Sequence, residues 1–500
     1  MTSATPSENS KTSSFGSYAR KLSITPKSSI HIHIKNHYRS KVYTTGSEVS
    51  GHVTINPPVD VRFDTLQVVL LGTSKTRLDA VNIPQSTAHT FLKLIMPIPE
   101  SAYPIPRVFE AGMTYTVPFT FVIPSTLTLN ACNHNVANDS VQEHHVRLPP
   151  SVGSWEKDDF SPNMSRVEYA VKARVYKDEE GVSLGTKLLE ACQEIRVLPA
   201  VPEDAPLNIT ENDDLYKMSK RKTLRKTIIS PKSGTVTITA TQPSAAILSP
   251  DGQTITTTSV PLTLEFEPSA TDVQPPKITG VSSKVAAVTF FSACGINHYP
   301  NLKDGRRKFS TDGRGSYSST VSASTGSIEA LRWGRHISMN ARRDSGYGSE
   351  GLSSSDSDQT PKTAPMKKSK GSLPSPVYYT SRVQVPIQLP AHKKAFIPTF
   401  HSCITSRVYV LSLTVSVSSG GASAHITLNV PLQISVEATE LHPNLSVLPP
   451  SFEEVEQADA ADYLQPYSTN IPTIDFQAGS ALPDYADIEF RQHRRPVAAH

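Results

Sequence analysis

The hydrophobic pattern of this chain is that of β-strands separated by polar turns. In Val117-Pro118-Phe119-Thr120-Phe121-Val122-Ile123-Pro124, two prolines flank a run whose residues Phe119, Phe121 and Ile123 fall on one face. Proline lacks an N–H and fixes φ, so it marks the ends of strands more often than their interior. The pattern therefore predicts a short strand between the prolines, with one face buried in a core.

A second strand of the same kind is predicted at residues 169–175. Its apolar residues Tyr169, Val171, Ala173 and Val175 alternate with lysine and arginine. Several such strands bordered by polar loops are typical of a β-sandwich. Because the pattern stops at a VPEDAP segment, the first sandwich is assigned to residues 28–200.

Gly234 begins a second series of strands with the sequence TVTITAT. This series has too few early strands to close a sandwich without open edges. The completing strands are predicted at residues 379–389, 406–417 and 424–436. The second sandwich is thus assigned to residues 233–440, interrupted by a disordered insertion rich in Ser, Gly, Arg and Lys at 301–376.

The remaining segments lack the periodicity of a core. Residues 1–27 are predicted to be a disordered arm and residues 441–500 a disordered tail. Residues 201–232 are predicted to be a basic connector, in which residues 215–226 are compatible with a helix. An apolar fraction of 37% and 40 prolines agree with a chain that is only partly folded. The fold class predicted is all-β, with two tandem β-sandwiches.

Charge and hydropathy narrow the class of partner. A net charge of +4 over 500 residues is small, so binding to nucleic acid is not expected. The N-terminal residues lack the apolar segment of a signal peptide, and no apolar run approaches the about 18 residues that span a bilayer. We expect an intracellular protein with peripheral membrane contact at most.

The four cysteines are distant from one another in sequence. Cys132, Cys192, Cys294 and Cys403 form none of the close pairs typical of zinc sites or redox motifs. We therefore expect buried or idle thiols in a reducing compartment, with no metal.

Enzyme chemistry has no recognisable motif in this sequence. It contains no Walker loop, GxSxG elbow, HExxH helix or paired CxxC. His31 and His33 are assigned to the solvent face of one strand, and His144-His145 to a polar, loop-like segment. The prediction is a protein without catalytic, cofactor or metal residues, although an unfamiliar sandwich enzyme stays an alternative.

Three motifs together resemble the α-arrestins, the fungal type of arrestin-related trafficking adaptor. These motifs are VPFTFVIP at 117–124, VEYAVKARVY at 167–176 and SGTVTITAT at 233–241. The resemblance extends over about residues 28–200 and 233–440. It implies two tandem immunoglobulin-like sandwiches that bind cargo proteins and have no active site.

The family also implies motifs of PPxY type, which recruit the WW domains of HECT-type ubiquitin ligases. Leu482-Pro483-Asp484-Tyr485 fits the LPxY variant, and Leu448-Pro449-Pro450-Ser451-Phe452 has Phe where Tyr is expected. Proline presets a polyproline II ridge for the WW aromatics, and the tyrosine ring and hydroxyl fill the adjacent groove. We expect Tyr485 to bind better than Phe452, and the two motifs to add. A full PPxY is absent, and Ser375-Pro376-Val377-Tyr378 is set aside because a strand begins there.

The insertion carries serines preceded by arginine. Ser345, Ser310 and Ser338 are therefore predicted phosphorylation sites for basophilic kinases, and once phosphorylated they are candidate ligands for 14-3-3 proteins. Residues 344–349 also fit the DSGxxS phosphodegron pattern.

Basic residues in the connector have several interpretations. The lysines are Lys217, Lys220, Lys222 and Lys226. They are candidates for ubiquitin acceptors, an acidic-lipid patch or a nuclear signal, and a solvated basic face is the alternative.

These observations predict a non-catalytic adaptor. It would bind cytosolic regions of plasma-membrane transporters or receptors and recruit a WW-domain HECT ubiquitin ligase, which promotes cargo ubiquitination and endocytosis. The expected location is the cytoplasm, with recruitment to plasma membrane and endosomes. The alternative is an arrestin-like signalling scaffold for a membrane receptor, in which ubiquitin is incidental.

Overall fold

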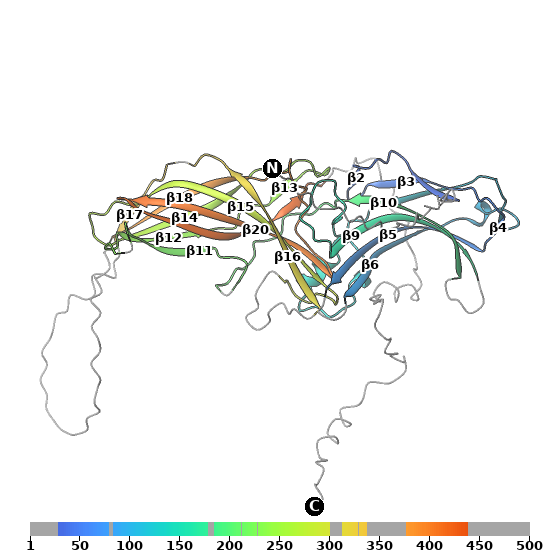
Figure 1. Cartoon of the computed structure of the whole chain (residues 1–500), viewed down its shortest axis with the longest axis horizontal. Coiled ribbons are helices and arrows are strands. Elements are labelled where there is room, and N and C mark those ends of the chain that lie inside the picture. Colours follow the sequence, from blue (N-terminus) through green and yellow to red (C-terminus); the bar gives the residue numbers. More distant parts are fainter. Residues whose placement is uncertain are drawn as a thin grey trace, which may run out of the picture.

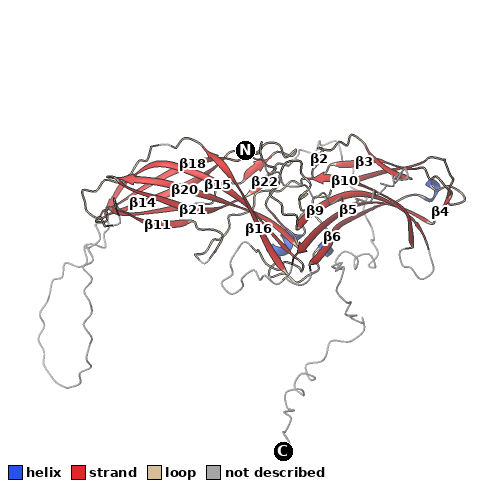
Figure 2. Ribbon diagram, in the orientation of Figure 1, coloured by secondary structure: helices blue, strands red, loops and turns tan. Residues whose placement is uncertain are grey.

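Two β-sandwiches lie end to end in an elongated molecule (Figure 1). The structure is a computed structural model, and it describes residues 29–79, 84–178, 185–211, 213–227, 229–300, 313–328, 330–337 and 377–438. Strands form nearly all the regular structure of this part of the chain (Figure 2). The predicted all-β fold is confirmed, and none of the described helices has the length and apolar character needed to span a membrane.

The N-terminal sandwich packs a three-stranded sheet, β1-β3-β8, against a five-stranded sheet, β2-β10-β9-β5-β6. Its strands are β1 (Ile30–Ile34), β2 (Val42–Tyr43), β3 (Glu48–Ile55), β4 (Val61–Arg62), β5 (Thr65–Leu78), β6 (Gln85–Met96), β7 (Val108–Phe109), β8 (Tyr115–Val122), β9 (Ser165–Lys177) and β10 (Thr186–Val197). Its helical elements are η1 (Glu100–Ala102), η2 (Leu129–Ala131) and α1 (Asp139–His145). The short strands β4 and β7 pair separately.

The two strands predicted most clearly from the sequence supply this core. Phe119, Phe121 and Ile123 are buried, as are the four apolar residues of β9 between Tyr169 and Val175. The predicted start of the first strand was wrong, because β8 begins at Tyr115 and contains Pro118. Proline is tolerated there because β8 is an edge strand that pairs only with β3.

The C-terminal sandwich is built from a continuous sheet that folds over on itself. Its strands are β11 (Ser219–Leu224), β12 (Gly234–Ala240), β13 (Ala246–Leu248), β14 (Thr258–Pro268), β15 (Lys277–Ser292), β16 (Arg314–Thr325), β17 (Gly334–Ile337), β18 (Val377–Gln388), β19 (Phe400–His401), β20 (Thr405–Ser419), β21 (Ala422–Leu432) and β22 (Ile434–Val436). One half has the order β11-β12-β14-β18, and the other is β16-β15-β20 with β21 and β19 on β20. The halves join through two residue pairs between β16 and β18.

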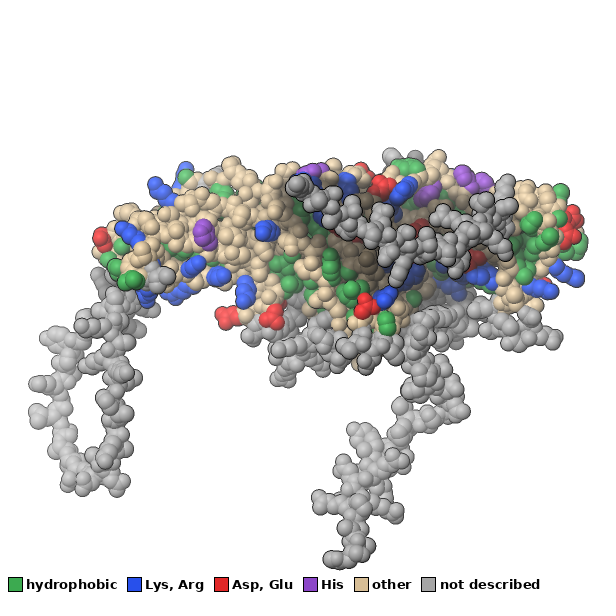
Figure 3. Space-filling view, viewed as in Figure 1, with side chains coloured by type: hydrophobic (Ala, Val, Ile, Leu, Met, Phe, Trp, Pro, Cys, Tyr) green, Lys and Arg blue, Asp and Glu red, His purple; other side chains and the backbone are tan. Residues whose placement is uncertain are grey.

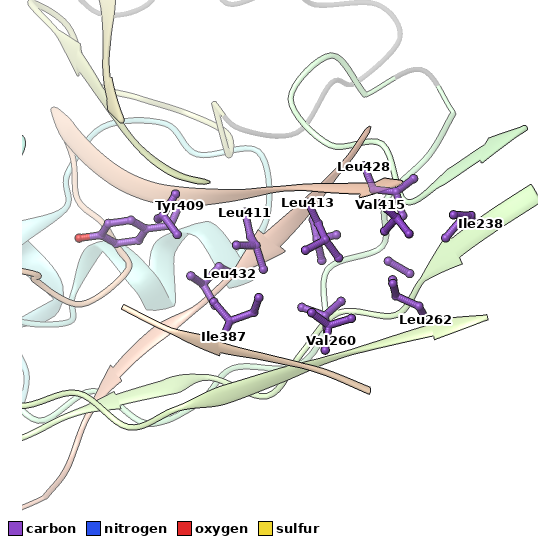
Figure 4. Close-up of a cluster of buried hydrophobic side chains, with 14 of the residues drawn as sticks. Ile238, Val260, Leu262, Ile387, Tyr409, Leu411, Leu413, Val415, Leu428 and Leu432 are labelled. Carbon is purple, nitrogen blue, oxygen red and sulfur yellow. The ribbon is translucent and has the colours of Figure 1, made fainter. Parts of the chain in front are cut away.

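Aliphatic side chains from both halves fill the space between them (Figure 4). Leu411 and Leu413 of β20 face Val260 and Leu262 of β14, and all four are almost completely buried. β14 alternates buried and more exposed residues along its length, and β20 does so from Leu411 onward, so the period of two places one row of side chains in the core. The first seven residues of β20 are all buried.

The range predicted as a disordered insertion contains two strands. β16 pairs antiparallel with β15 over ten residue pairs, and β17 pairs with β18. The sequence pattern missed β16 because its alternating residues are mostly Ser and Thr, with only Val321 and Ala323 packing on the core. The rest of residues 301–376 lies largely outside the described residues, as do residues 1–28 and 439–500.

The connector forms a strand where its sequence was compatible with a helix. Residues Ser219–Leu224 form the edge strand β11, which pairs with β12. Its first four residues are exposed and only Leu224 reaches the core. Lysine and arginine on an edge strand discourage pairing with another molecule, which accounts for a basic strand at this position.

Candidate functional site

The two sandwiches share side chains across their junction. Phe160 and Leu198, from the N-terminal part of the chain, lie in the C-terminal core. Conversely, Ile397 and Phe400 from the C-terminal part complete the N-terminal core. Trp155 packs against both clusters. The junction is therefore a packed interface.

Buried polar groups form the centre of this interface. Arg407 of β20 is fully buried, and its Nε donates a hydrogen bond to the Thr289 hydroxyl at 2.8 Å. Its terminal nitrogens donate to the Asp159 carbonyl at 2.8 Å and the Ser161 hydroxyl at 2.9 Å. Because Asp159 and Ser161 belong to the N-terminal part, this guanidinium connects the two sandwiches. The bonds to Thr289 and Asp159 are buried, and the bond to Ser161 is partly buried.

Hydroxyl groups connect the same elements nearby. Thr405 Oγ1 lies 3.3 Å from Ser74 Oγ on β5 and 3.1 Å from Ser165 Oγ on β9. Thr76 on β5 donates a hydrogen bond to the Ser292 carbonyl on β15 at 2.7 Å. These bonds fix the first residue of β20 against the N-terminal five-stranded sheet.

Beside these bonds, four metal-ligating side chains converge from three short segments. Cys132 follows η2 directly, and His134 comes two residues later. His145 is the last residue of α1, whose first turn is capped by Asn138 accepting a hydrogen bond from the Val141 N–H at 3.0 Å. Cys403 lies in the turn between β19 and β20. The helical elements η2 and α1 lie in the middle of the molecule in Figure 2.

The ligand atoms of these four residues all lie within 4.8 Å of one another. Cys132 Sγ is 3.7 Å from His134 Nε2 and 3.5 Å from His145 Nδ1. Cys132, His145 and Cys403 are 5%, 2% and 3% exposed, while His134 is half-buried. We refer to these four residues as the Cys/His cluster.

Protonation in the cluster follows from its internal contacts. Hydrogen bonds from Cys403, and then from His134 and His145, lower the pKa of the Cys132 thiol despite its burial. The same bond to Cys132, together with burial, raises the pKa of Cys403. The bond to Cys132 also raises the pKa of His134. These contacts therefore shift the pKa of Cys132 towards the thiolate form, which is the form that binds a metal.

Surrounding groups position the cluster. The Cys403 Sγ lies 3.6 Å from the Ala131 carbonyl oxygen, and the Cys403 carbonyl accepts a hydrogen bond from the Ile296 N–H at 2.7 Å. His89 on β6 lies close to Cys132, His134 and His145, and its burial lowers its pKa to about 4. Its Nε2 is buried without a hydrogen-bond partner among the described residues.

A second polar group surrounds the neighbouring residue of α1, His144. His144 contacts the Tyr299 hydroxyl through Nδ1 at 2.8 Å and Asp204 through Nε2 at 3.3 Å. Arg147 pairs with the same carboxylate at 2.7 Å. Hydrogen bonds from His144 and Arg147 outweigh burial and lower the pKa of Asp204 to about 2. These bonds hold α1 against the segments on both sides of it.

The structure adds one contact that sequence spacing did not show, and it corrects one expectation. Cys132 and Cys403 are free, buried thiols, as expected, but they lie close together in space although they are distant in sequence. His144 and His145 belong to a helix rather than a loop, and His145 is buried. The only local signal was Cys132-Asn133-His134 followed by a histidine at 145, because the fourth ligand is 258 residues further along.

Two other predictions are confirmed. His31 and His33 lie on the exposed face of β1. Cys192 and Cys294 are free cysteines on the surface. Val377 begins β18, which agrees with setting aside the motif ending at Tyr378.

The four connector lysines are exposed on and beside β11. Lys220 and Lys222 lie on the strand, and the Lys222 ammonium donates to the His425 carbonyl of β21 at 3.1 Å. Lys217 pairs through its backbone with Asn429, and Lys226 follows β11. Figure 3 shows Lys and Arg side chains along the edge of the sandwich where Figure 1 places β11.

The remaining predicted site residues lie outside the described residues. These are Leu482, Pro483, Tyr485, Pro449, Pro450 and Phe452 of the WW-binding motifs, and Ser345, Ser310 and Ser338 of the phosphorylation sites. They stay predictions from the sequence.

Comparison with known proteins does not assign a family. No protein-family model matches this chain, and no curated protein is significantly similar to it.

Proposed function

We propose that this chain is a non-catalytic adaptor of the arrestin-related type. It binds the cytosolic regions of plasma-membrane transporters or receptors and recruits a WW-domain HECT ubiquitin ligase, so that the cargo is ubiquitinated and endocytosed. It acts from the cytoplasm at the plasma membrane and endosomes. The observation that carries this proposal is the pair of tandem sandwiches with shared cores, because it agrees with the architecture that the sequence motifs imply.

The architecture suits an adaptor because two packed domains present one long surface to a partner protein (Figure 3). A depression of about 440 Å³ beside residues 100–107 is open to solvent. Its charged residues Glu100 and Arg107 pair with each other. This depression is more open than the enclosed pockets in which small substrates react.

Ligase recruitment rests on the sequence beyond the last described residue. Leu482, Pro483 and Tyr485 supply the proline and tyrosine of a WW ligand, while Pro449, Pro450 and Phe452 supply a second, weaker one. Two ligands on one chain increase the apparent affinity for a ligase with several WW domains.

Binding of the full chain to isolated WW domains from a HECT ligase tests this proposal. The wild type is expected to bind, and the double variant Tyr485→Ala/Phe452→Ala is expected to lose binding. Phe476→Ala is the matched control, because it removes an aromatic ring from the same region without touching either motif. If the wild type does not bind, ligase recruitment is refuted and the signalling scaffold is the better proposal.

The connector lysines are tested in a reconstituted ubiquitination reaction with the same ligase. Replacing Lys217, Lys220, Lys222 and Lys226 by arginine keeps the charge and removes the acceptor amines. We expect the ubiquitin on this chain to fall in the quadruple variant. Unchanged ubiquitination would show that these four lysines are not the ubiquitin acceptors.

A further inference from the structure

We propose that Cys132, His134, His145 and Cys403 bind one zinc ion, and that this ion joins the two sandwiches. The proposal rests on the geometry of the Cys/His cluster, and it does not depend on the adaptor function. Two thiols and two imidazoles are the ligand set of structural zinc sites.

The distances within the cluster match a tetrahedral site. Zinc lies about 2.3 Å from a thiolate sulfur and about 2.0–2.1 Å from an imidazole nitrogen, so a tetrahedral angle separates sulfur and nitrogen by about 3.6 Å. Cys132 Sγ lies 3.7 Å from His134 Nε2 and 3.5 Å from His145 Nδ1. All four ligand atoms lie within 4.8 Å of one another, so small side-chain adjustments close the site.

The orientation of His134 also fits a metal ligand. Its Nδ1 lies 3.2 Å from the Asn135 carbonyl, to which it can only donate. A neutral His134 that donates from Nδ1 leaves the lone pair of Nε2 facing Cys132. Fixing the tautomer of a ligating imidazole through a backbone carbonyl is a common feature of metal sites.

The ligand types favour zinc over harder ions. Thiolate and imidazole are poor ligands for Mg²⁺ and Ca²⁺, which prefer oxygen. Four protein ligands complete the coordination of zinc, so no position remains for water or substrate. Three of the ligands are almost completely buried, and this agrees with a structural ion.

Binding changes the protonation of the cluster in a defined way. Both cysteines bind as thiolates and both histidines as neutral imidazoles. Each thiol proton, and any proton on His134, therefore passes to the solvent when the four bonds to zinc form. The ion carries two positive charges and the two thiolates two negative charges, so the filled site is neutral overall.

The placement of the ligands gives the ion its role. Cys132, His134 and His145 belong to one segment of the N-terminal part, whereas Cys403 lies in the turn that begins β20. The ion thus adds four bonds at a place where weak thiol contacts, a few backbone bonds and a small apolar cluster join η2, α1 and the β19–β20 turn in the described residues. Losing it is expected to loosen the junction before either core unfolds.

The experiment measures metal in the full chain purified under reducing conditions, without added chelator. Elemental analysis is expected to find about one zinc per chain. Chelation should remove the zinc and lower the Tm by on the order of 5–10 °C. Added Zn²⁺ should restore the zinc content and the Tm. Cys403→Ser and Cys132→Ser should lose most of the zinc. The matched control Cys192→Ser, which alters an exposed cysteine on β10, should keep it.

A second measurement does not depend on whether variants fold. Co²⁺ added to the reduced, metal-free wild type should give visible bands of a tetrahedral ion and a thiolate-to-cobalt charge-transfer band, which zinc then abolishes. The proposal is overturned if the natively folded, reduced chain contains no zinc and takes up neither ion stoichiometrically. Cysteine mapping that finds a Cys132–Cys403 disulfide, with no metal uptake after reduction, would overturn it equally.

Discussion

The interior of the C-terminal sandwich and the junction between the sandwiches are equally buried but built from opposite chemistry. The sandwich interior consists of aliphatic side chains such as Leu413 and Val260 (Figure 4). The junction has Arg407, Thr405 and the Cys/His cluster at its centre. An aliphatic side chain is stabilised by any apolar neighbour, whereas a buried polar group needs a specific partner at a specific distance. The first region should therefore carry most of the stability, and the second should determine how the domains are arranged.

The largest effect is expected in the aliphatic interior. Leu413→Ala removes a fully buried side chain from β20, and the cavity left behind should lower the free energy of unfolding by about 2–5 kcal/mol. Urea denaturation followed by circular dichroism measures it. Ile247→Ala, at a position that is 42% exposed, is the control and should change little. Equal losses in the two variants would break the proposed difference between interior and surface.

A smaller effect is expected at the centre of the junction. Arg407→Met keeps an unbranched side chain but leaves the Asp159 carbonyl and the Thr289 and Ser161 hydroxyls without their donor. Hydrogen bonds to charged groups are worth about 1.5–3 kcal/mol, and the loss should be of this order. In the variant, the fluorescence of Trp155, which packs against both cores, should change at a lower urea concentration than the circular dichroism signal does. Coincident transitions would show that Arg407 does not couple the domains.

The hydroxyl network should contribute less than the guanidinium. Thr405→Val preserves shape but removes the group between Ser74 and Ser165, with an expected loss of about 0.5–1.5 kcal/mol in urea denaturation. Thr414→Val is the matched control, because its 2.9 Å contact with Thr427 lies on an exposed face within one sandwich. A loss from Thr414→Val as large as that from Thr405→Val would argue against a special role for the junction.

The smallest effect is expected on the basic edge. Arg221 of β11 pairs with Glu267 of β14, and both side chains are about half exposed to solvent. Exposed pairs are worth about 0–1 kcal/mol and weaken with salt. A double-mutant cycle of Arg221→Ala and Glu267→Ala in low and high salt measures this energy. A coupling energy larger than the loss of stability in Thr405→Val would reverse the proposed ranking.

The same contrast explains what could be read from the sequence. Alternating apolar residues predicted β8 and β9 and the strands that complete the second sandwich, because one buried face leaves a period of two. β16 has the same backbone pairing but presents Ser and Thr, so its pattern resembled a linker. β11 also lacks an apolar alternation, because only Leu224 is buried, and so its basic sequence was compatible with a helix.

The Cys/His cluster has no comparable pattern. Only the proximity of Cys132 and His134 was visible, because His145 faces inward through the geometry of a two-turn helix and Cys403 comes from a distant turn. Sequence spacing reports residues that share an element, whereas this cluster forms only when η2, α1 and the β19–β20 turn meet.

The exchange of side chains between the two cores has a consequence for synthesis of the protein on the ribosome. Residues 28–200 emerge first, but Ile397 and Phe400, which complete their core, are translated nearly 200 residues later. At about 5–20 residues per second, the nascent N-terminal domain spends roughly 10–40 s with an unfilled gap in its interior. During that time its apolar surface is accessible to chaperones. The N-terminal half expressed by itself should therefore aggregate, although it contains every strand of its own two sheets.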